Sequence, residues 1–153
     1  MENARPPEPP HPAKDVTDHI GYRLKRAQAA LRTAMDRALR EHDLTVPQYS
    51  CLESLALHPG LSNAELARAT FVTRQSMNVV LRTLQDAGLT TRPDTVDHGR
   101  ARPARLTDEG RRRLRAAQES VYAIEARMVR AVPDERLADL LENLDRLAQA
   151  LDA

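Results

Sequence analysis

Apolar residues recur every three or four positions in the first third of the chain. Between Asp15 and about Glu41 this spacing predicts one long amphipathic helix. At 1.5 Å per residue such a helix would be roughly 40 Å long, which indicates that it packs against a partner subunit. Its apolar face consists of Val16, Ile20, Leu24, Ala27, Leu31, Met35 and Ala38.

The last third of the chain repeats this pattern in two further segments. From Thr107 to about Ala131, apolar residues alternate at three- and four-residue spacing, as in a coiled coil. Pro133 ends that segment, because proline cannot continue a helix. The residues that follow predict a final helix with an apolar face of Leu137, Leu140, Leu141, Leu144, Leu147 and Leu151.

Three short segments in the middle of the chain begin with a hydroxyl residue that can cap a helix. Thr45 with Gln48, and Ser62 with Glu65, match the capping-box pattern, in which each side chain bonds the other residue's backbone. Thr73 is a suitable N-cap for the third segment. We therefore expect helices at about 46–57, 63–69 and 74–87, the last one ending at Gly88.

The second and third of these helices are separated by "ATFVT", a spacing typical of a helix-turn-helix. The segments "LTTRP" and "RPARLT" then predict two strands joined by the polar loop "DTVDHGRA", which together would form a wing. The expected fold is mainly α: a winged helix-turn-helix with long N- and C-terminal dimerisation helices and a small two- or three-stranded β wing. The expected organisation is a disordered Pro-rich tail (1–13), an N-terminal dimerisation helix (14–42), a winged helix DNA-binding module (43–107) and C-terminal dimerisation helices (108–153).

The segment expected to be the third capped helix has two chemically distinct faces. Successive residues turn by about 100°, which places Met77, Val80, Leu81 and Leu84 on one side. The opposite side presents Gln75, Asn78 and Arg82, with Arg74 at its N-terminal edge. Amide and guanidinium groups can each bond a base edge in the major groove at two points, so this face predicts DNA recognition. The alternative is an ordinary solvated helix surface.

Arginines are concentrated in the expected wing and just after it. Residues 100–115 contain seven arginines and only two acids, although the whole chain has a net charge of +1. Such a patch attracts a polyanion. Arg100 and Arg102, near the tip of the hairpin, are candidates to enter a DNA minor groove. The alternative is that they only keep a loop soluble.

Composition excludes several other classes of protein. The chain is 41% hydrophobic and 29% charged, as in a folded soluble protein. Since no apolar run approaches the ~20 residues of a membrane span, we expect a cytoplasmic protein. Cys51 is the single cysteine, and the five histidines lack metal-ligand spacing, so we expect neither a disulfide nor a metal site. No nucleophile–base constellation or phosphate-binding glycine loop is visible, so we expect no cofactor and no enzymatic activity.

Residues 15 to 151 resemble the MarR family of winged-helix transcriptional regulators. The resemblance rests on "LSNAELARATFVTRQSMNVVLRTLQDAGL", the hairpin segment "DHGRARPARLT" and the helix start "TDEGRRRL". It implies a homodimer that binds a pseudo-palindromic operator in double-stranded DNA. Where that family often has D-x-R or D-G-R in the wing, this chain has His98 before Gly99 and Arg100, with the acid at Asp97. The resemblance implies recognition-helix positions at Thr73, Arg74, Gln75, Ser76, Asn78 and Arg82, and makes Arg100 the wing-tip arginine.

Many members of that family release DNA when a small, often phenolic anion binds between the dimerisation helices and the winged module. His19, Tyr22, Arg23 and Tyr49 are the candidates for such an effector site, because a guanidinium suits a carboxylate. Their alternatives are a solvated Arg23 and a Tyr49 that belongs to the core. We therefore expect a DNA-binding repressor that is released by a small effector such as an aromatic acid.

Two alternatives to that function remain open. One is a redox-responsive regulator acting through Cys51, although a position within the apolar side of its helix suits a small buried hydrophobic residue better. The other is a helical interaction protein whose winged module binds no DNA.

Overall fold

A computed structural model describes residues 15–92 and 103–152. The chain divides into two units, residues 1–33 and 34–153, and each is described by itself. No helix within 15–92 or 103–152 is long and apolar enough to cross a membrane. The elements in chain order are η1 (Val16–Asp18), α1 (Ile20–Arg40), α2 (Val46–Leu57), α3 (Asn63–Ala69), α4 (Arg74–Asp86), β1 (Thr90–Thr91), β2 (Arg105–Leu106), α5 (Asp108–Arg130) and α6 (Asp134–Leu151).

The prediction of one continuous helix from Asp15 is wrong in its first turn. The Asp15 side chain accepts a hydrogen bond from Thr17 N at 3.2 Å, which closes the short 3₁₀ turn η1. His19 then takes an extended conformation, with φ −74° and ψ 135°, so that α1 starts only at Ile20. Arg23 Nε donates to Thr17 O at 2.6 Å and holds η1 against the start of α1.

The predicted caps of the winged module are confirmed. Thr45 Oγ1 accepts from Gln48 N at 3.3 Å, and Gln48 Oε1 accepts from Thr45 N at 2.9 Å. Ser62 and Glu65 form the same reciprocal pair: Ser62 Oγ accepts from Glu65 N at 3.3 Å, and Glu65 Oε2 accepts from Ser62 N at 2.7 Å. The hydrogen bond from the Ser62 backbone is the main reason that the pKa of Glu65 is lowered. Because each pair satisfies backbone N–H groups that a first helical turn leaves free, α2 and α3 begin where the sequence predicts.

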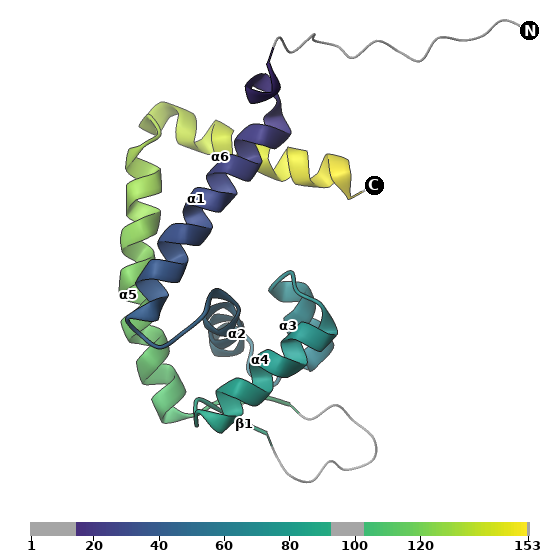
Figure 1. Cartoon of the computed structure of the whole chain (residues 1–153), viewed down its shortest axis with the longest axis vertical. Helices are drawn as coiled ribbons and strands as arrows, with labels where there is room; N and C mark the ends of the chain where they lie inside the picture. The colour runs from purple at the N-terminus through teal and green to yellow at the C-terminus, as the bar shows by residue number, and fades with distance from the viewer. Residues whose placement is uncertain (1–14, 93–102, 153) are drawn as a thin grey trace, which may run out of the picture. The chain divides into compact units, whose positions relative to one another are not determined.

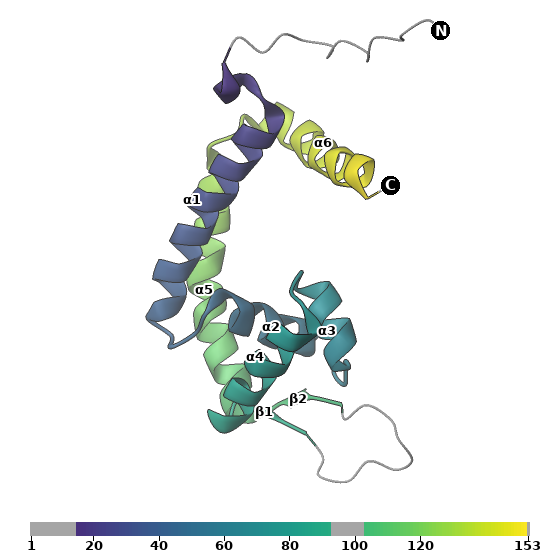
Figure 2. The same cartoon turned by 45° about the vertical axis from the view of Figure 1, so that its right-hand side comes forward.

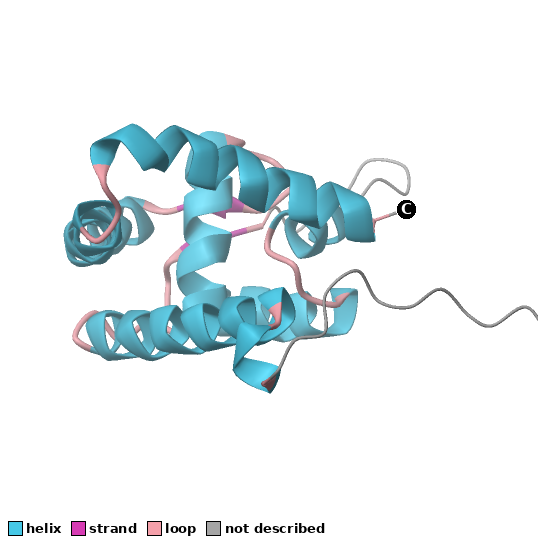
Figure 3. Ribbon diagram, turned by 90° about the horizontal axis from the view of Figure 1, so that it is seen from above, coloured by secondary structure: helices cyan, strands magenta, loops and turns pink. Residues whose placement is uncertain are grey.

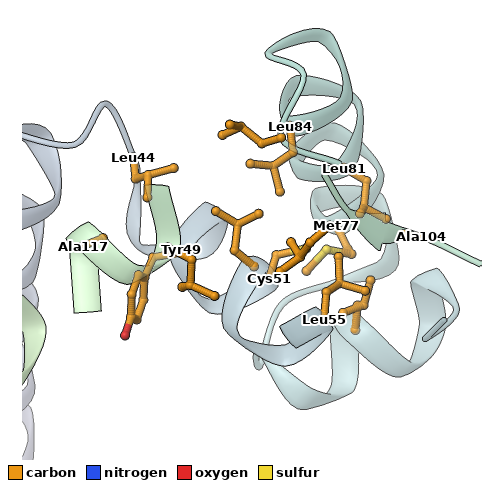
Figure 4. Close-up of a cluster of buried hydrophobic side chains, with 14 of the residues drawn as sticks. Leu44, Tyr49, Cys51, Leu55, Met77, Leu81, Leu84, Ala104 and Ala117 are labelled. Carbon is orange, nitrogen blue, oxygen red and sulfur yellow. The ribbon is translucent and has the colours of Figure 1, made fainter. Parts of the chain in front are cut away.

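The hydrophobic core is centred on α2, which packs against α4 on one side and α5 on the other (Figure 1). Leu52 of α2 is completely buried. Leu55 of α2 and Met77 and Leu84 of α4 are almost completely buried beside one another (Figure 4). Burying a leucine or methionine side chain contributes roughly 1.5–3 kcal/mol, so this packing fixes the recognition helix onto the rest of the module.

The wing starts from a short antiparallel sheet beside the end of α4 (Figure 2). Thr90 pairs with Leu106 and Thr91 with Arg105, in agreement with the predicted hairpin. Gly60, which has φ +88°, donates its N–H to Ala104 O at 3.2 Å and connects the turn after α2 to this sheet. The strands are a minor part of a mainly helical chain, as expected (Figure 3).

The start of α5 lies unusually close to the end of α4. A Cβ on Gly110 would be 2.0 Å from Leu89 O, so only glycine fits there. Thr107 caps α5 by accepting from Gly110 N at 3.0 Å, and its hydroxyl donates to Gly88 O at 2.6 Å. Gly88 has φ +73°, the left-handed conformation that ends a helix favourably. These bonds fix the base of the wing between α4 and α5.

Candidate nucleic-acid interface

The two predicted faces of α4 are present in the structure. Met77, Leu81 and Leu84 have exposed fractions of 0%, 2% and 1%, and Val80 is partly buried against the same core. On the other side, the predicted DNA-reading side chains all lie in solvent. They are Arg74, Gln75, Asn78 and Arg82.

The N-terminal end of α4 is arranged to attract an anion. Thr73 Oγ1 accepts from Ser76 N at 3.1 Å and donates to Ser76 Oγ at 2.9 Å, so the Thr73 hydroxyl serves mainly to cap the helix. The first turn contains no acid, and Arg74 adds a positive charge to the positive end of the helix dipole. A DNA phosphate near this turn would be stabilised by both.

Asn63 is a contributor that the sequence did not reveal. It is the first residue of α3, and its Nδ2 donates to Oδ1 of Asn78 on α4. One acceptor position of the Asn78 amide is thereby used within the protein, and the amide is held in one orientation with its N–H groups free to donate. A hydrogen bond between residues fifteen positions apart leaves no local pattern in the sequence.

Two exposed apolar residues also lie on or beside α4. Phe71, in the turn between α3 and α4, is 96% exposed and has φ +56°. Val79 is 63% exposed and lies within about 40° of Gln75 on the same face of the helix. Turns of this kind often contain glycine, so the sequence signal here was a phenylalanine at a turn position.

The arginines predicted at the tip of the wing, Arg100 and Arg102, lie outside the described residues. Of the arginines nearby, Arg105 is exposed on β2. Two arginines of α5 instead form ion pairs with Glu109. Arg112 Nη2 lies 2.7 Å from Glu109 Oε2, and Arg113 Nη2 lies 3.6 Å from Glu109 Oε1. The hydrogen bond from Arg112 is the main reason that the pKa of Glu109 is lowered.

Two of the four candidate effector residues, Tyr49 and Arg23, have side-chain partners within the protein. Tyr49 is only 3% exposed, and its hydroxyl donates to Glu53 Oε1 at 3.0 Å. Burial and then the negative charge of Glu53 raise the pKa of Tyr49. His19, Tyr22 and Arg23 belong to the unit 1–33, where the Arg23 guanidinium lies 4.0 Å from Asp18. Tyr49 therefore behaves as a core residue, the alternative that the sequence left open.

Cys51 is fully buried in the core (Figure 4). Burial raises the pKa of its thiol to about 12, although the charge of Arg92 opposes this rise. Because the thiolate is the reactive form, Cys51 is protected from oxidation at neutral pH in the folded protein. Within the described ranges no group of three or more histidine, cysteine, aspartate or glutamate residues could hold a metal ion.

A capped helix, a short turn, a second helix with an exposed polar face and a two-stranded hairpin define a winged helix-turn-helix protein. The family model described as "MarR family" matches residues 42–101. The HTH-type transcriptional repressor Rv2887 of Mycobacterium tuberculosis (strain ATCC 25618 / H37Rv) is 42% identical over 128 residues, which make up 84% of this chain and 92% of the relative. The chain belongs to the MarR family of DNA-binding transcriptional regulators.

Two solved structures of Rv2887 from Mycobacterium tuberculosis resemble this chain over most of their length. The complex with DNA has a TM-score of 0.69 and 40% identity, covering 84% of this chain and 97% of that one. The complex with salicylic acid has a TM-score of 0.67 and 42% identity, covering 84% and 96%. These values confirm the predicted family and fold.

Proposed function

We propose that this protein is a homodimeric repressor that binds a pseudo-palindromic operator through α4 and the wing, and that a small organic acid releases it. The observation that carries the proposal is α4 itself, because one face is buried against α2 while the other offers amide and guanidinium groups to solvent. A major groove admits one helix of this kind. The relative Rv2887 is a repressor with a solved DNA complex, which supports the same role here.

Within α4 we assign separate roles to the predicted residues. Gln75, Asn78 and Arg82 read base edges, because they share the central exposed face. Arg74, Ser76 and Thr73 lie at the positive N-terminal end and contact the phosphate backbone. In the wing, Arg100 and Arg102 reach the adjacent minor groove.

Dimerisation is assigned to the helices at the two ends of the chain. Proteins of this family are dimers. We propose that residues 14–42 and 108–153 form the dimer interface around a DNA-binding module at 43–107. A dimer doubles the recognition surface and matches the two half-sites of a palindrome.

A regulator of this kind needs no catalytic site. We propose that the protein is not an enzyme, and that it acts in the cytoplasm, where operator DNA is found. The proposal includes a small-molecule effector because the relative Rv2887 has a solved complex with salicylic acid.

The proposal is tested by selecting bound sequences from random duplex DNA with the full-length protein and measuring affinities for the selected site and for a scrambled one. Gln75→Ala and Asn78→Ala should each weaken binding to the selected site by roughly 1–3 kcal/mol, because each removes a two-point hydrogen-bonding interaction with a base. The effect on the scrambled site should be much smaller. Asn63→Ala should also weaken binding to the selected site more than binding to the scrambled one, because the Asn78 amide loses the hydrogen bond that holds its orientation.

Gln149→Ala on α6 is the matched control for Gln75→Ala, because it removes the same side chain from an exposed position on the side of that helix away from its leucines. It should retain the affinity of the wild type. Equal losses of affinity for the selected and scrambled sites in Gln75→Ala would refute a base-reading role. Failure of the wild type to select any sequence would refute the repressor function and favour a protein-binding module.

A further inference from the structure

The hydrogen bond between Asn63 and Asn78 joins the two helices of the helix-turn-helix and has a direction. Nδ2 of Asn63 donates to Oδ1 of Asn78, so the oxygen of the Asn78 amide points toward α3. α3 packs against α4 (Figure 2), and both Leu66 of α3 and Met77 of α4 have an exposed fraction of 0%. Because the two helices are held together by this core, the bond links groups at fixed positions.

The Asn63 side chain is the better held of the two amides. Asn63 is the first residue of α3 and directly follows the N-cap Ser62. The reciprocal hydrogen bonds of Ser62 and Glu65 fix the backbone on both sides of it. The Asn63 side chain is half-buried, whereas Asn78 is exposed. The inner amide therefore orients the outer one.

The far end of the Asn63 amide supports this direction of the bond. Oδ1 of Asn63 is buried and accepts no hydrogen bond from any residue within 15–92 or 103–152. If both amides were turned over, Nδ2 of Asn63 would take that place, and two N–H donors would lack a partner instead of one acceptor. Buried N–H groups without a partner are rarer in proteins than such carbonyl oxygens. The observed direction is thus the more favourable one, and it leaves the N–H groups of Asn78 facing solvent.

The direction of the bond decides which base Asn78 can read at two points. Guanine presents two neighbouring acceptors in the major groove, O6 and N7, whereas adenine presents its N6 amino donor beside N7. An amide that reads adenine at two points must offer both its oxygen and its NH₂ group. The oxygen of Asn78 already accepts from Asn63. Its outward NH₂ group therefore suits guanine and opposes the amino group of adenine or cytosine.

Arg82 extends this donor surface along α4. It lies four residues after Asn78, one helical turn further along the same exposed side, and a guanidinium has donors only. Gln75 provides a contrast within the same helix. Its side chain is exposed and has no hydrogen-bonding partner among the described residues, so it can offer either end of its amide to a base.

We propose that Asn63 is a positioning residue that makes Asn78 select guanine rather than adenine in the operator. The proposal rests on the proposed base-reading role of α4 and adds the class of base that Asn78 reads. Asn63 itself contacts no base in this arrangement. Its contribution is the orientation of the Asn78 amide.

The test first locates the base that Asn78 reads, which is the position of the selected site where Asn78→Ala loses its base preference. At that position the wild type should prefer guanine to adenine by roughly tenfold. Replacing the guanine by 7-deazaguanine should weaken wild-type binding, because N7 is lost, and should have little effect on Asn78→Ala.

Two substitutions of Asn63 then separate orientation from packing. Asn63→Ala should largely abolish the preference, because either end of the Asn78 amide can then face the base. Asn63→Asp should reverse it in favour of adenine or cytosine. A carboxylate only accepts, so Asn78 must turn its NH₂ group toward α3 and its oxygen toward the base.

Each preference is a ratio of two affinities measured with one preparation, so partial unfolding of a variant does not change it. Arg68→Ala, at an exposed position of α3, is the matched control and should keep the preference for guanine even if its total affinity falls. A wild type that prefers adenine at this position would overturn the proposal. A preference for guanine that persists in both Asn63 variants would do the same.

A second measurement tests the direction of the bond without DNA. In ¹⁵N NMR spectra of the free protein, an N–H of the Asn63 side chain should exchange slowly with solvent, and those of Asn78 should exchange rapidly. The opposite pattern would overturn the proposal. A wild type that selects no DNA sequence would refute the proposed function and this inference together, whereas a selected site with adenine at the Asn78 position would refute this inference alone.

Discussion

At the residue scale, Phe71 is the side chain whose position is least favourable for folding. A non-glycine residue in the left-handed region costs roughly 1–2 kcal/mol, and a fully exposed phenyl ring regains nothing by burial. It stands two residues before Thr73, the N-cap of α4. An apolar side chain beside a recognition helix can contact the methyl group of thymine in the major groove.

We predict that Phe71→Gly weakens DNA binding without lowering stability. Glycine adopts the left-handed conformation without the steric strain that phenylalanine has there. This relief of strain offsets the larger conformational entropy of glycine in the unfolded chain, so the Tm should stay the same or rise. Binding to the selected site should fall by roughly 1 kcal/mol, and replacing one thymine by uracil should cost the wild type more than the variant. A lower Tm with unchanged DNA affinity would show that Phe71 serves the fold instead.

Single residues were predicted well where a local pattern specifies them. The division of α4 into buried and exposed residues follows from helical periodicity alone, and it was predicted correctly. The side-chain hydrogen bonds of Asn63 and Tyr49 were not predicted, because their partners, Asn78 and Glu53, lie on another element or another turn. Side-chain hydrogen bonds between elements depend on packing that a single sequence does not display.

At the element scale, the junction of β1, β2 and α5 determines where the wing begins. The sequence predicts α2 and α3 at their observed bounds because their capping boxes are local signals. The start of α1 was misplaced because the same residues, Asp15 to His19, can form either a helical turn or a 3₁₀ turn. The close backbone approach between Gly110 and Leu89 has no sequence signature other than the glycine.

We predict that Gly110→Ala destabilises the protein by about 2 kcal/mol or more. The added methyl group would overlap Leu89 O, so the start of α5 must move and weaken the bonds that Thr107 makes. Urea unfolding at a fixed protein concentration measures the change in the free energy of unfolding.

Gly21→Ala is the matched control for that experiment. No atom lies within 4 Å of a Cβ built on Gly21, the second residue of α1, so alanine fits there and should leave the stability equal or slightly higher. Similar effects of the two substitutions would mean that the close approach at Gly110 is unimportant. If operator binding uses the wing as proposed, Gly110→Ala should also reduce DNA affinity in excess of its effect on stability.

At the scale of the whole molecule, α6 is the described helix of the unit 34–153 whose leucines are most exposed. Leu140, Leu141 and Leu144 have exposed fractions of 39%, 55% and 40%, and Leu151 reaches 82%. None of these residues belongs to the core of the winged module, which is formed by Leu39 at the end of α1 together with residues from Leu44 to Ala117. The apolar face therefore fits the dimer that is typical of this family.

We predict that Leu141→Glu combined with Leu144→Glu converts the dimer into a folded monomer. Placing two carboxylates in an apolar interface costs several kcal/mol, whereas the winged module keeps its own core. Sedimentation equilibrium should give the mass of one chain, near 17.1 kDa. Circular dichroism should show that the helices remain, and Gln149→Glu, on the same helix, should stay dimeric.

The same variant separates recognition from dimerisation. A monomer retains α4 and the wing, so it should still prefer its half-site over scrambled DNA, but with weak affinity and a shallower dependence on salt because fewer phosphates are bound. DNA that carries both half-sites should bind the wild type far more tightly than DNA with one half-site, because a dimer bound to the first half-site binds the second one intramolecularly. The monomeric variant should gain much less from the second half-site. If Leu141→Glu/Leu144→Glu remains dimeric and binds the full operator as the wild type does, the interface lies elsewhere and α6 has a different partner.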